Sequence, residues 1–355
     1  MSPKVLLYLH IPYCDSKCHY CSFNSYVDKF DTRTTYMQAL CRQLEFELKR
    51  FSVQPDSLDT LFIGGGTPST IPPELYAPVF ELLDPYLKKD AEITTEANPN
   101  SASETWLSGM RSLGVNRISF GVQSFDAAKL KALNRAHSPA EAIEAIHTAK
   151  ALGFEHLSLD IIYNFQGDTK ALLLSDIRQA FTLPIDHISA YELTIEAKTN
   201  FAKRPEARQE NDALAHFVAK SITEQGFTQY EISNFGSYQS RHNKGYWRLE
   251  NYIGAGAGAV GFLEDTRYYP LSDIDAYIAD PMKISEERVS ENDLMTEKIF
   301  LGLRSTIGID KALLPTALQQ RADYLVEREK LILDNGTYQN PDLFLADEIA
   351  LYLLD

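Results

Sequence analysis

Six short β-rich runs alternate with amphipathic stretches over about the first 225 residues, and this alternation constrains the fold more than any other feature. Alternation of this kind predicts an α/β fold with a parallel sheet covered by helices. Eight strands close a full barrel of this type, so six strands predict a sheet that stays open on one side. The predicted strands are Val5–His10, Leu58–Ile63, Glu92–Thr95, Arg117–Phe120, His156–Ile162 and His187–Tyr191, and the predicted helices are Thr35–Arg50, Glu74–Leu87, Ala140–Leu152 and Ala171–Thr182.

Polar or glycine-rich residues follow every predicted strand. Parallel α/β sheets and barrels bind their ligands at the carboxyl ends of the strands, so these segments should meet on one face. We therefore expect a binding site there. The six segments are Tyr13–Cys21, Gly64–Ser69, Glu96–Pro99, Gly121–Ser124, Tyr163–Gly167 and Glu192–Thr194.

The composition changes beyond residue 225, which predicts one domain over residues 1–225 and a second over 226–355. Aromatic and polar residues crowd into Tyr230–Tyr252, and helical patterns follow around Asp293–Ser305 and Pro315–Lys330. An Asn335-Gly336 pair between apolar runs in Leu331–Leu345 is a hairpin signal. The second domain is therefore predicted to be mixed, with a helical, winged-helix-like end.

The charge and cysteine content exclude several classes of protein. The 34 Lys+Arg and 49 Asp+Glu give a net charge of −15, which disfavours general binding to nucleic acid or anionic membranes. No segment reaches the roughly 18 apolar residues of a membrane span, and Val5–Leu9 is too short for a signal-peptide core. We expect an unprocessed soluble protein of the cytoplasm, whose reducing conditions suit clustered cysteines.

Three of the four cysteines form a C-x3-C-x2-C pattern directly after the first predicted strand: Cys14, Cys18 and Cys21. Three closely spaced thiolates can hold three irons of a [4Fe–4S] cluster and leave the fourth iron open to a small molecule. The alternative is a zinc site completed by His10 or His19, but structural zinc sites usually combine two separated ligand pairs. Cys41 lies within a helical pattern and is expected to serve packing.

The cysteine spacing, with an aromatic residue before the last Cys, resembles that of the radical S-adenosylmethionine (SAM) superfamily. The resemblance implies a partial, open (β/α)6 barrel in which the open iron chelates the amine and carboxylate of SAM. Gly64-Gly65-Gly66-Thr67-Pro68 follows the second predicted strand. It resembles the segment that contacts the SAM amino group in that superfamily, which implies SAM contacts for Gly65, Gly66 and Thr67.

Four polar residues lie at or just beyond strands three to five: Glu96, Gln123, Arg135 and Asp160. Taken singly, each is better explained as a loop cap or a surface charge, although their chemistry suits a zwitterionic nucleoside. Together they resemble the oxygen-independent coproporphyrinogen III oxidase branch of the superfamily along nearly the whole chain. The resemblance implies that these four residues and Tyr8 bind SAM.

Two features of the sequence bear on which branch of the superfamily this chain resembles. The oxidases carry a further Cys two residues after the third, where this chain has Phe23. The segment from His242 to Trp247, H-N-K-G-Y-W, resembles the heme-binding motif of the HemW-type heme chaperones. Imidazole is a common heme ligand, although without the resemblance a histidine beside aromatic residues is better explained as a hydrogen-bonded interface or core residue.

Two main functional hypotheses follow. In the first, the chain is a heme chaperone that binds a [4Fe–4S] cluster, SAM and heme, with His242 as heme ligand, and passes heme to acceptor proteins such as respiratory enzymes. In the second, it is an enzyme that decarboxylates coproporphyrinogen III through a deoxyadenosyl radical. A zinc-stabilised barrel is the third option. A dimer, and membrane association through a partner, remain open.

One further motif is rejected. Gly256 to Gly261 spells G-x-G-x-x-G, the pattern of dinucleotide-binding loops. That pattern needs a preceding strand and a following helix, but no strong strand precedes it here and Phe262 to Pro270 follow it in place of a helix. Within the family resemblance, many relatives carry His where this chain has Val260, so any function of that His is in doubt.

Overall fold

The computed structural model describes residues 4–355 and confirms the six predicted strands. They are parallel and lie side by side in chain order. All six carboxyl ends therefore point to the same edge of the sheet. The strands are β1 (Val5–Ile11), β2 (Leu58–Gly65), β3 (Leu87–Ala97), β4 (Arg117–Gln123), β5 (His156–Tyr163) and β6 (His187–Glu192).

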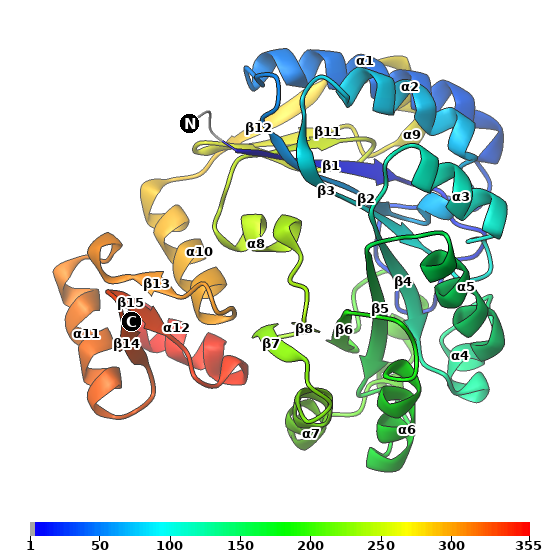
Figure 1. The fold of residues 1–355 in the computed structure, drawn as a ribbon. Coiled ribbons are helices and arrows are strands. Elements are labelled where there is room, and N and C mark those ends of the chain that lie inside the picture. Colours follow the sequence, from blue (N-terminus) through cyan, green and yellow to red (C-terminus); the bar gives the residue numbers. More distant parts are fainter. Residues whose placement is uncertain (1–3) are drawn as a thin grey trace.

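Helices cover the outer, convex face of this curved sheet (Figure 1). The main hydrophobic core lies between the two layers, where strand residues such as Leu61, Ile118 and Leu159 meet apolar helix faces. The covering helices are α1 (Arg33–Arg50), α2 (Pro73–Leu83), α3 (Glu104–Ser112), α4 (Ala127–Ala132), α5 (Pro139–Ala151) and α6 (Lys170–Ala180). Cys41, in α1, packs against this core, as predicted.

The predicted boundary between the second helix and the third strand is wrong. The helix was expected to reach Leu87 but ends at Leu83. Pro85 explains the difference: Asp84 still has helical angles and donates to the Phe80 carbonyl, but proline has no backbone N–H to continue the helix. Strand β3 instead begins at Leu87, and its first half was missed because Lys89 and Asp90 are polar and exposed.

Strands from beyond residue 225 extend the same sheet at both ends, to twelve in total. At one end β8 pairs antiparallel with β6, and at the other end β9 pairs parallel with β1. The sheet therefore continues past residue 225, and the domain division there remains a prediction. The added elements are α7 (Asp212–Thr223), β7 (Thr228–Glu231), β8 (Asn234–Gly236), β9 (Tyr252–Ala255), β10 (Gly261–Leu263), β11 (Thr266–Pro270) and β12 (Ile284–Arg288).

Strand β9 corrects one expectation, because a strand does precede the G-x-G-x-x-G pattern. It was missed because it is short and contains Gly254, where a Cβ atom would lie 1.9 Å from the Val260 carbonyl oxygen. No helix follows it, since Gly261 begins β10. The dinucleotide interpretation is therefore still rejected.

Helix α8 (Arg241–Trp247), which carries the H-N-K-G-Y-W segment, lies on the concave side of the sheet (Figure 1). The chain then forms β9 to β12 and helix α9 (Ile274–Ala279), which packs on α1. Short 3-10 helices occupy Phe30–Thr32, Pro68–Thr70, Asn200–Lys203, Pro205–Ala207, Lys311–Leu313 and Leu343–Leu345.

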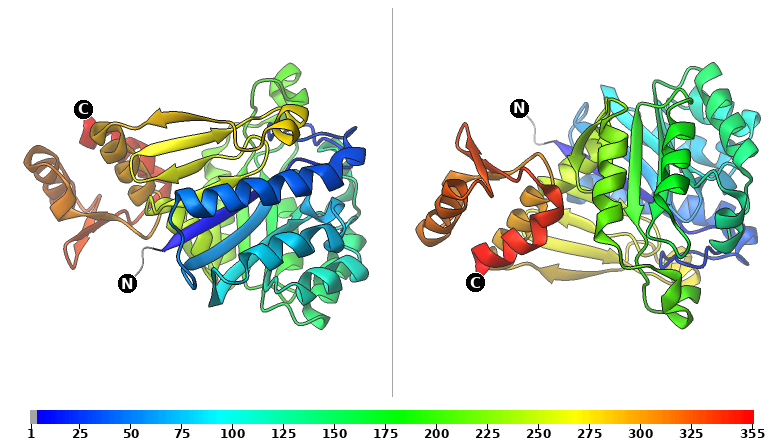
Figure 2. Two further views of the ribbon diagram at one scale, coloured as in Figure 1. Left: turned by 90° about the horizontal axis from the view of Figure 1, so that it is seen from above. Right: turned by 90° about the horizontal axis from the view of Figure 1, so that it is seen from below.

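The C-terminal helices and a three-stranded sheet form a second hydrophobic core, beside the large sheet (Figure 2). The predicted hairpin is confirmed, with Asn335 and Gly336 both at positive φ in a two-residue turn. The elements are α10 (Glu291–Leu303), β13 (Ile309–Asp310), α11 (Thr316–Glu327), β14 (Ile332–Asp334), β15 (Thr337–Gln339) and α12 (Ala346–Leu354).

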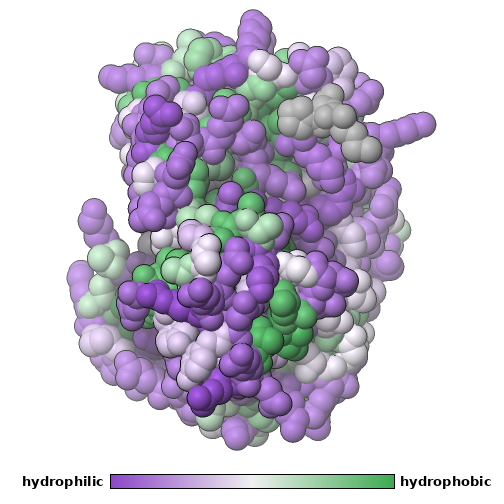
Figure 3. Space-filling view, turned by 90° about the vertical axis from the view of Figure 1, so that its left-hand side faces the viewer, coloured by the Kyte–Doolittle hydropathy of each residue, from purple (hydrophilic) through white to green (hydrophobic). Residues whose placement is uncertain are grey.

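On the face that carries the C-terminal helices, hydrophilic side chains dominate and hydrophobic ones form separate patches (Figure 3). Among residues 4–355, no helix has the length and apolar character required to cross a membrane.

Candidate functional site

A cavity of about 490 Å³ opens at the carboxyl ends of the six parallel strands. We call it the cysteine cavity. Its volume lies within the range of small-molecule sites. All the predicted site residues except Tyr8 and His242 line it, namely Cys14, Cys18, Cys21, Gly65, Gly66, Thr67, Glu96, Gln123, Arg135 and Asp160. The expectation that the strand ends share one face is therefore confirmed.

The three cysteines of this cavity are unbridged thiols, and side-chain hydrogen-bond donors are directed at two of their sulfurs. The Thr67 hydroxyl donates to Cys14 Sγ at 3.4 Å, and Arg135 Nη1 donates to Cys18 Sγ at 3.2 Å. Burial raises the pKa of the Cys14 and Cys21 thiols. A bound metal centre would stabilise their thiolates, so the donor set fits an iron–sulfur cluster.

A site for a single metal ion fits the cysteine loop less well than an iron–sulfur cluster does. Within residues 4–355, no three His, Cys, Asp or Glu side chains converge as one metal ion would require. A cubane makes no such demand, since each thiolate binds a different iron. Both ring nitrogens of His10 are already engaged, with the Tyr8 hydroxyl and the Asn24 carbonyl. His10 is therefore unsuited to complete a zinc site.

The triple-glycine turn has a packing reason of its own. A Cβ on Gly66 would lie 2.7 Å from the Tyr13 carbonyl oxygen, beneath the cysteine loop. Gly65 has a φ of +112°, and a Cβ there would lie 2.5 Å from the His10 ring. These glycines bring the β2 turn against the cysteine loop, so the protein needs them whether or not a ligand approaches.

Glu96 and Asp160 are carboxylates in the wall of this cavity. Burial and the Asp160 charge raise the pKa of Glu96 to about 8, although Glu96 accepts the Gly65 N–H at 3.1 Å. Burial raises the pKa of Asp160 to about 6. A ligand with an ammonium group and hydroxyls would stabilise the ionised form of both carboxyl groups.

Asn98 was missed by the sequence analysis and belongs to the same wall. Its side-chain oxygen accepts a hydrogen bond from Arg135 Nη2 at 2.6 Å, and its amide donates to Thr67 Oγ1 at 3.1 Å. It therefore links the residues that donate to two of the cysteine sulfurs. Its position two residues after Glu96, in the same strand-end loop, is the signal that could have identified it.

Gln123 lies at the end of β4 in the left-handed region, with a φ of 71°. The pairing of β4 with β5 shifts register just before it. A left-handed conformation costs a non-glycine residue about 1–3 kcal/mol and is commonest at functional sites. The strain supports a ligand-binding role for Gln123.

A polar interior lies below the cavity and was also missed. Inward-facing residues alternate with core residues along the strands, as in Arg117-Ile-Ser119, and the inner layer contains hydrogen bonds such as Ser158 to His187. Arg117 is fully buried, with an unpartnered Nε. Alternation of polar and apolar residues within the strands is the sequence signal for this layer.

Tyr8 lies outside the cysteine cavity, on the wall of a neighbouring one. Its hydroxyl bonds His10 Nδ1 at 2.9 Å. Burial and the nearby Glu96 charge hold the pKa of Tyr8 well above its usual value. Tyr8 therefore stands between the two cavities.

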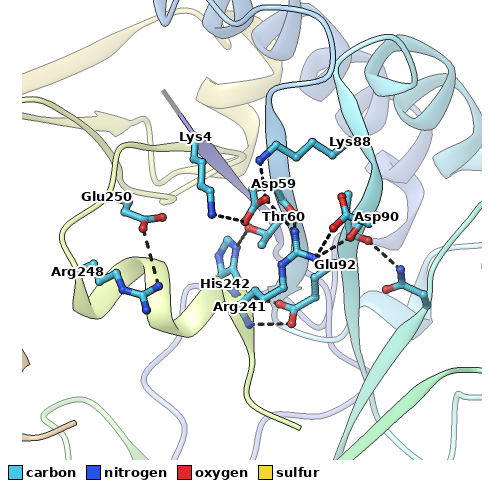
Figure 4. A network of polar contacts seen from close by, with 12 residues as sticks. Lys4, Asp59, Thr60, Lys88, Asp90, Glu92, Arg241, His242, Arg248 and Glu250 are labelled. Carbon is cyan, nitrogen blue, oxygen red and sulfur yellow. Dashed lines mark hydrogen bonds and ion pairs between the residues drawn. The ribbon is translucent and has the colours of Figure 1, made fainter. Parts of the chain in front are cut away.

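His242 is buried on α8, away from the cysteine cavity. Its Nδ1 lies 2.7 Å from Thr60 Oγ1, whereas its Nε2 has no hydrogen-bond partner (Figure 4). Its ring stacks on Phe62 and meets the Tyr246 ring edge-on, with centroids 4.6 Å apart. Burial lowers the pKa of His242 to about 4, so the imidazole is neutral near pH 7.

Glu92 of β3 fixes the N-terminus of α8 (Figure 4). Its carboxylate accepts the backbone N–H groups of Arg241 and His242 at 2.8 and 3.0 Å. It also accepts the hydroxyls of Tyr238 and Ser240. A carboxylate at a helix N-terminus satisfies free N–H groups and the helix dipole together, so it anchors this helix inside the barrel.

Comparison with known proteins assigns the family. The model of the radical SAM superfamily matches residues 8–179. The "Heme chaperone HemW" of Haemophilus influenzae is 33% identical over 99% of both chains. The chain belongs to the HemW family. The HemW of Escherichia coli is 41% identical over 73% of this chain and 70% of its own length.

A solved structure matches the fold of this HemW-family chain over nearly its whole length. The coproporphyrinogen III oxidase HemN of Escherichia coli, a radical SAM enzyme, has a TM-score of 0.82 and covers 99% of this chain and 90% of its own. At 17% identity, this likeness shows the shared fold alone.

Proposed function

We propose that this HemW-family protein binds a [4Fe–4S] cluster, SAM and heme, and delivers heme to acceptor proteins, respiratory enzymes among them. The observation that carries the proposal is the full-length match to a relative named as a heme chaperone. The part of this chain that is matched includes both the cysteine loop and the H-N-K-G-Y-W segment. Three unbridged thiols suit the reducing cytoplasm, where we propose that the protein acts.

The cysteine cavity would hold the first two cofactors. Cys14, Cys18 and Cys21 would ligate the cluster, and the cluster would supply an iron with an open position and one-electron chemistry. Glu96 and Asp160 would accept hydrogen bonds from the ammonium group and hydroxyls of SAM. The other predicted SAM contacts are Tyr8, Gly65, Gly66, Thr67, Gln123 and Arg135.

His242 would ligate heme through Nε2. When Nδ1–H donates to Thr60, the neutral ring presents its free lone pair on Nε2, as a metal ligand requires. The unpartnered buried Nε2 supports this role, because a buried polar atom without a partner is costly. The Tyr246 ring against His242 would have to turn aside before iron reached it.

The second candidate is the oxidative decarboxylation of coproporphyrinogen III, which the fold would permit. Phe23 stands where the oxidases carry a further cysteine, and this substitution disfavours the enzymatic alternative. We therefore retain decarboxylation as the outcome that would overturn the proposal.

The test uses the full chain, reconstituted anaerobically with iron and sulfide. We expect binding of hemin, transfer of heme to a purified apo-hemoprotein and no conversion of coproporphyrinogen III in the presence of SAM and a reductant. Cys18→Ala should abolish cluster loading, while Cys41→Ala, in the α1 packing layer, should retain it. Robust decarboxylation by the wild-type chain would contradict the chaperone proposal.

A further inference from the structure

A second cavity, with a volume of about 660 Å³, neighbours the cysteine cavity. It lies between β1, the end of the cysteine loop, the end of α8 and helix α10. We call it the aromatic cavity. Neither the cluster nor the predicted SAM contacts account for it, apart from Tyr8 in its wall.

Aromatic and aliphatic side chains dominate its lining. Five aromatic rings face it, and the Gly258-Ala259 segment adds a wall without large side chains, against which a flat molecule can lie. Apolar walls with a few polar groups are typical of small-molecule sites. The rings belong to Tyr8, Phe23, Tyr246, Tyr252 and Phe300.

One charged pair lies at this cavity. Arg267 of β11 donates to Glu297 of α10 at 2.6 Å. A guanidinium has five N–H donors, so Arg267 can also bind a ligand carboxylate. A planar apolar ligand that carries carboxylate groups matches both the aromatic walls and this cation.

The aromatic cavity adjoins the heme motif. Tyr246 forms part of its wall, and His242 lies directly behind Tyr246 with Nε2 unpartnered. The Tyr246 ring therefore lies between the cavity and the His242 side chain. Turning this ring aside would open the cavity toward His242.

Phe23 lines both cavities. It is 65% exposed, more than any other large hydrophobic side chain in the described part of the chain. Exposing an aromatic ring forgoes the free energy of its burial, and a flat ligand stacked on it would restore that energy. Phe23 therefore marks the edge where ligands in the two cavities would meet.

We propose that the aromatic cavity is a binding site for a planar tetrapyrrole with carboxylate side chains. Its rings stack on the macrocycle, Arg267 binds a carboxylate, and Phe23 forms the wall shared with the cysteine cavity. This inference rests on the proposed heme function and names the location of the ligand.

The test fills the cavity from a side chain that belongs neither to the cysteine cavity nor to the H-N-K-G-Y-W segment. Leu301 of α10 lines the cavity and is absent from both large hydrophobic cores. Leu301→Trp should weaken binding of hemin and of metal-free protoporphyrin at least tenfold, as measured by absorbance titration. Leu294→Trp, on the same helix but outside the cavity lining, is the matched control and should bind both like the wild type. Iron content and SAM binding should be unchanged in both variants.

The metal-free probe separates the cavity from the iron ligand. His242→Ala should weaken hemin binding and leave protoporphyrin binding unchanged, whereas Leu301→Trp should weaken both. Val260→Phe fills the same cavity from another lining residue and replaces Leu301→Trp if that variant does not fold. Wild-type affinity in a folded, cavity-filled variant would overturn the site, even if His242→Ala still lost hemin. Failure of the wild-type chain to bind hemin would instead overturn the proposed function.

Discussion

The guanidinium of Arg135 donates a hydrogen bond from Nη1 to the sulfur of Cys18 at 3.2 Å, while its Nη2 is held by Asn98. A positive charge thus lies in contact with one of the three proposed cluster ligands. Hydrogen bonds to the sulfurs and local charge are among the factors that set the reduction potential of an iron–sulfur cluster.

Arg135→Gln should therefore lower the reduction potential of the reconstituted cluster. We expect a shift of about 60 mV, equivalent to about 1.4 kcal/mol for one electron, without loss of iron. Redox titration followed by electron paramagnetic resonance measures it, and Lys131→Gln, on the exposed face of α4, is the control. An unchanged potential would show that the Arg135 contact does not influence the cluster.

The raised pKa of Glu96 predicts that the stability of the cofactor-free protein depends on pH. Its pKa of about 8 exceeds the ordinary 4.5, so between these values the folded state keeps a proton that the unfolded state loses. The free energy of unfolding should fall as pH rises through this window, by up to about 1.4 kcal/mol per pH unit. Asp160 adds an effect of the same sign between 3.8 and about 6.

Glu96→Gln should flatten that dependence between pH 6 and pH 8, because the amide does not titrate. Urea unfolding of the two proteins at several pH values measures the difference. Glu74→Gln, on the exposed side of α2, should follow the wild-type curve. If the free energies of unfolding of wild type and Glu96→Gln changed in parallel with pH, Glu96 would be ruled out as the source of the pH dependence.

The Thr60 hydroxyl should strengthen hemin binding through its hydrogen bond with His242. Thr60→Val removes the partner of Nδ1 and frees the ring to place its proton on Nε2, which cannot then ligate iron. We expect hemin binding to weaken about tenfold, in the 10–100-fold range known for partners of metal-ligating histidines. Thr60→Ser keeps the hydroxyl and should bind hemin normally. Equal affinities for the two variants would argue against Nε2 as the ligand.

Glu92 should stabilise the fold through α8. Burial alone would raise its pKa, but Arg117 and the N–H donors of α8 lower it, so Glu92 is ionised and stabilising above pH 4.5. Glu92→Gln should reduce the free energy of unfolding at pH 7 by about 3 kcal/mol. Asp90→Asn, on the same strand with an 82% exposed side chain, should change it by less than about 0.5 kcal/mol. Similar values for the two variants would contradict the anchoring role.

The sequence was informative where a pattern has a direct physical cause. Strands β1 to β6 were recognisable because their outward residues form the apolar core with the helices. Strand β9 was not, because it is short and contains Gly254, which only the close approach of the Val260 backbone explains. No local pattern reveals a constraint that a distant segment imposes.

The site residues likewise divide into those that local sequence patterns reveal and those that only the three-dimensional structure reveals. The strand-end rule grouped the cysteines with Glu96 and Asp160, because parallel strands end at one edge. Tyr8, which only the family resemblance assigned to the SAM site, lies on the wall of the neighbouring cavity. For His242, the hydrogen-bonded core interpretation holds for Nδ1 but not for Nε2, and only the three-dimensional structure distinguishes the two nitrogens.

The pairing of β9 with β1 has a consequence for any shortened form of this protein. On one flank, the strand that leads into the cysteine loop pairs with residues 252–255, far along the chain. A truncated polypeptide that stops near residue 225 would leave that flank bare, and bare strand edges invite self-association. A polypeptide of residues 1–225 should therefore aggregate when expressed by itself, although it contains all three proposed cluster ligands.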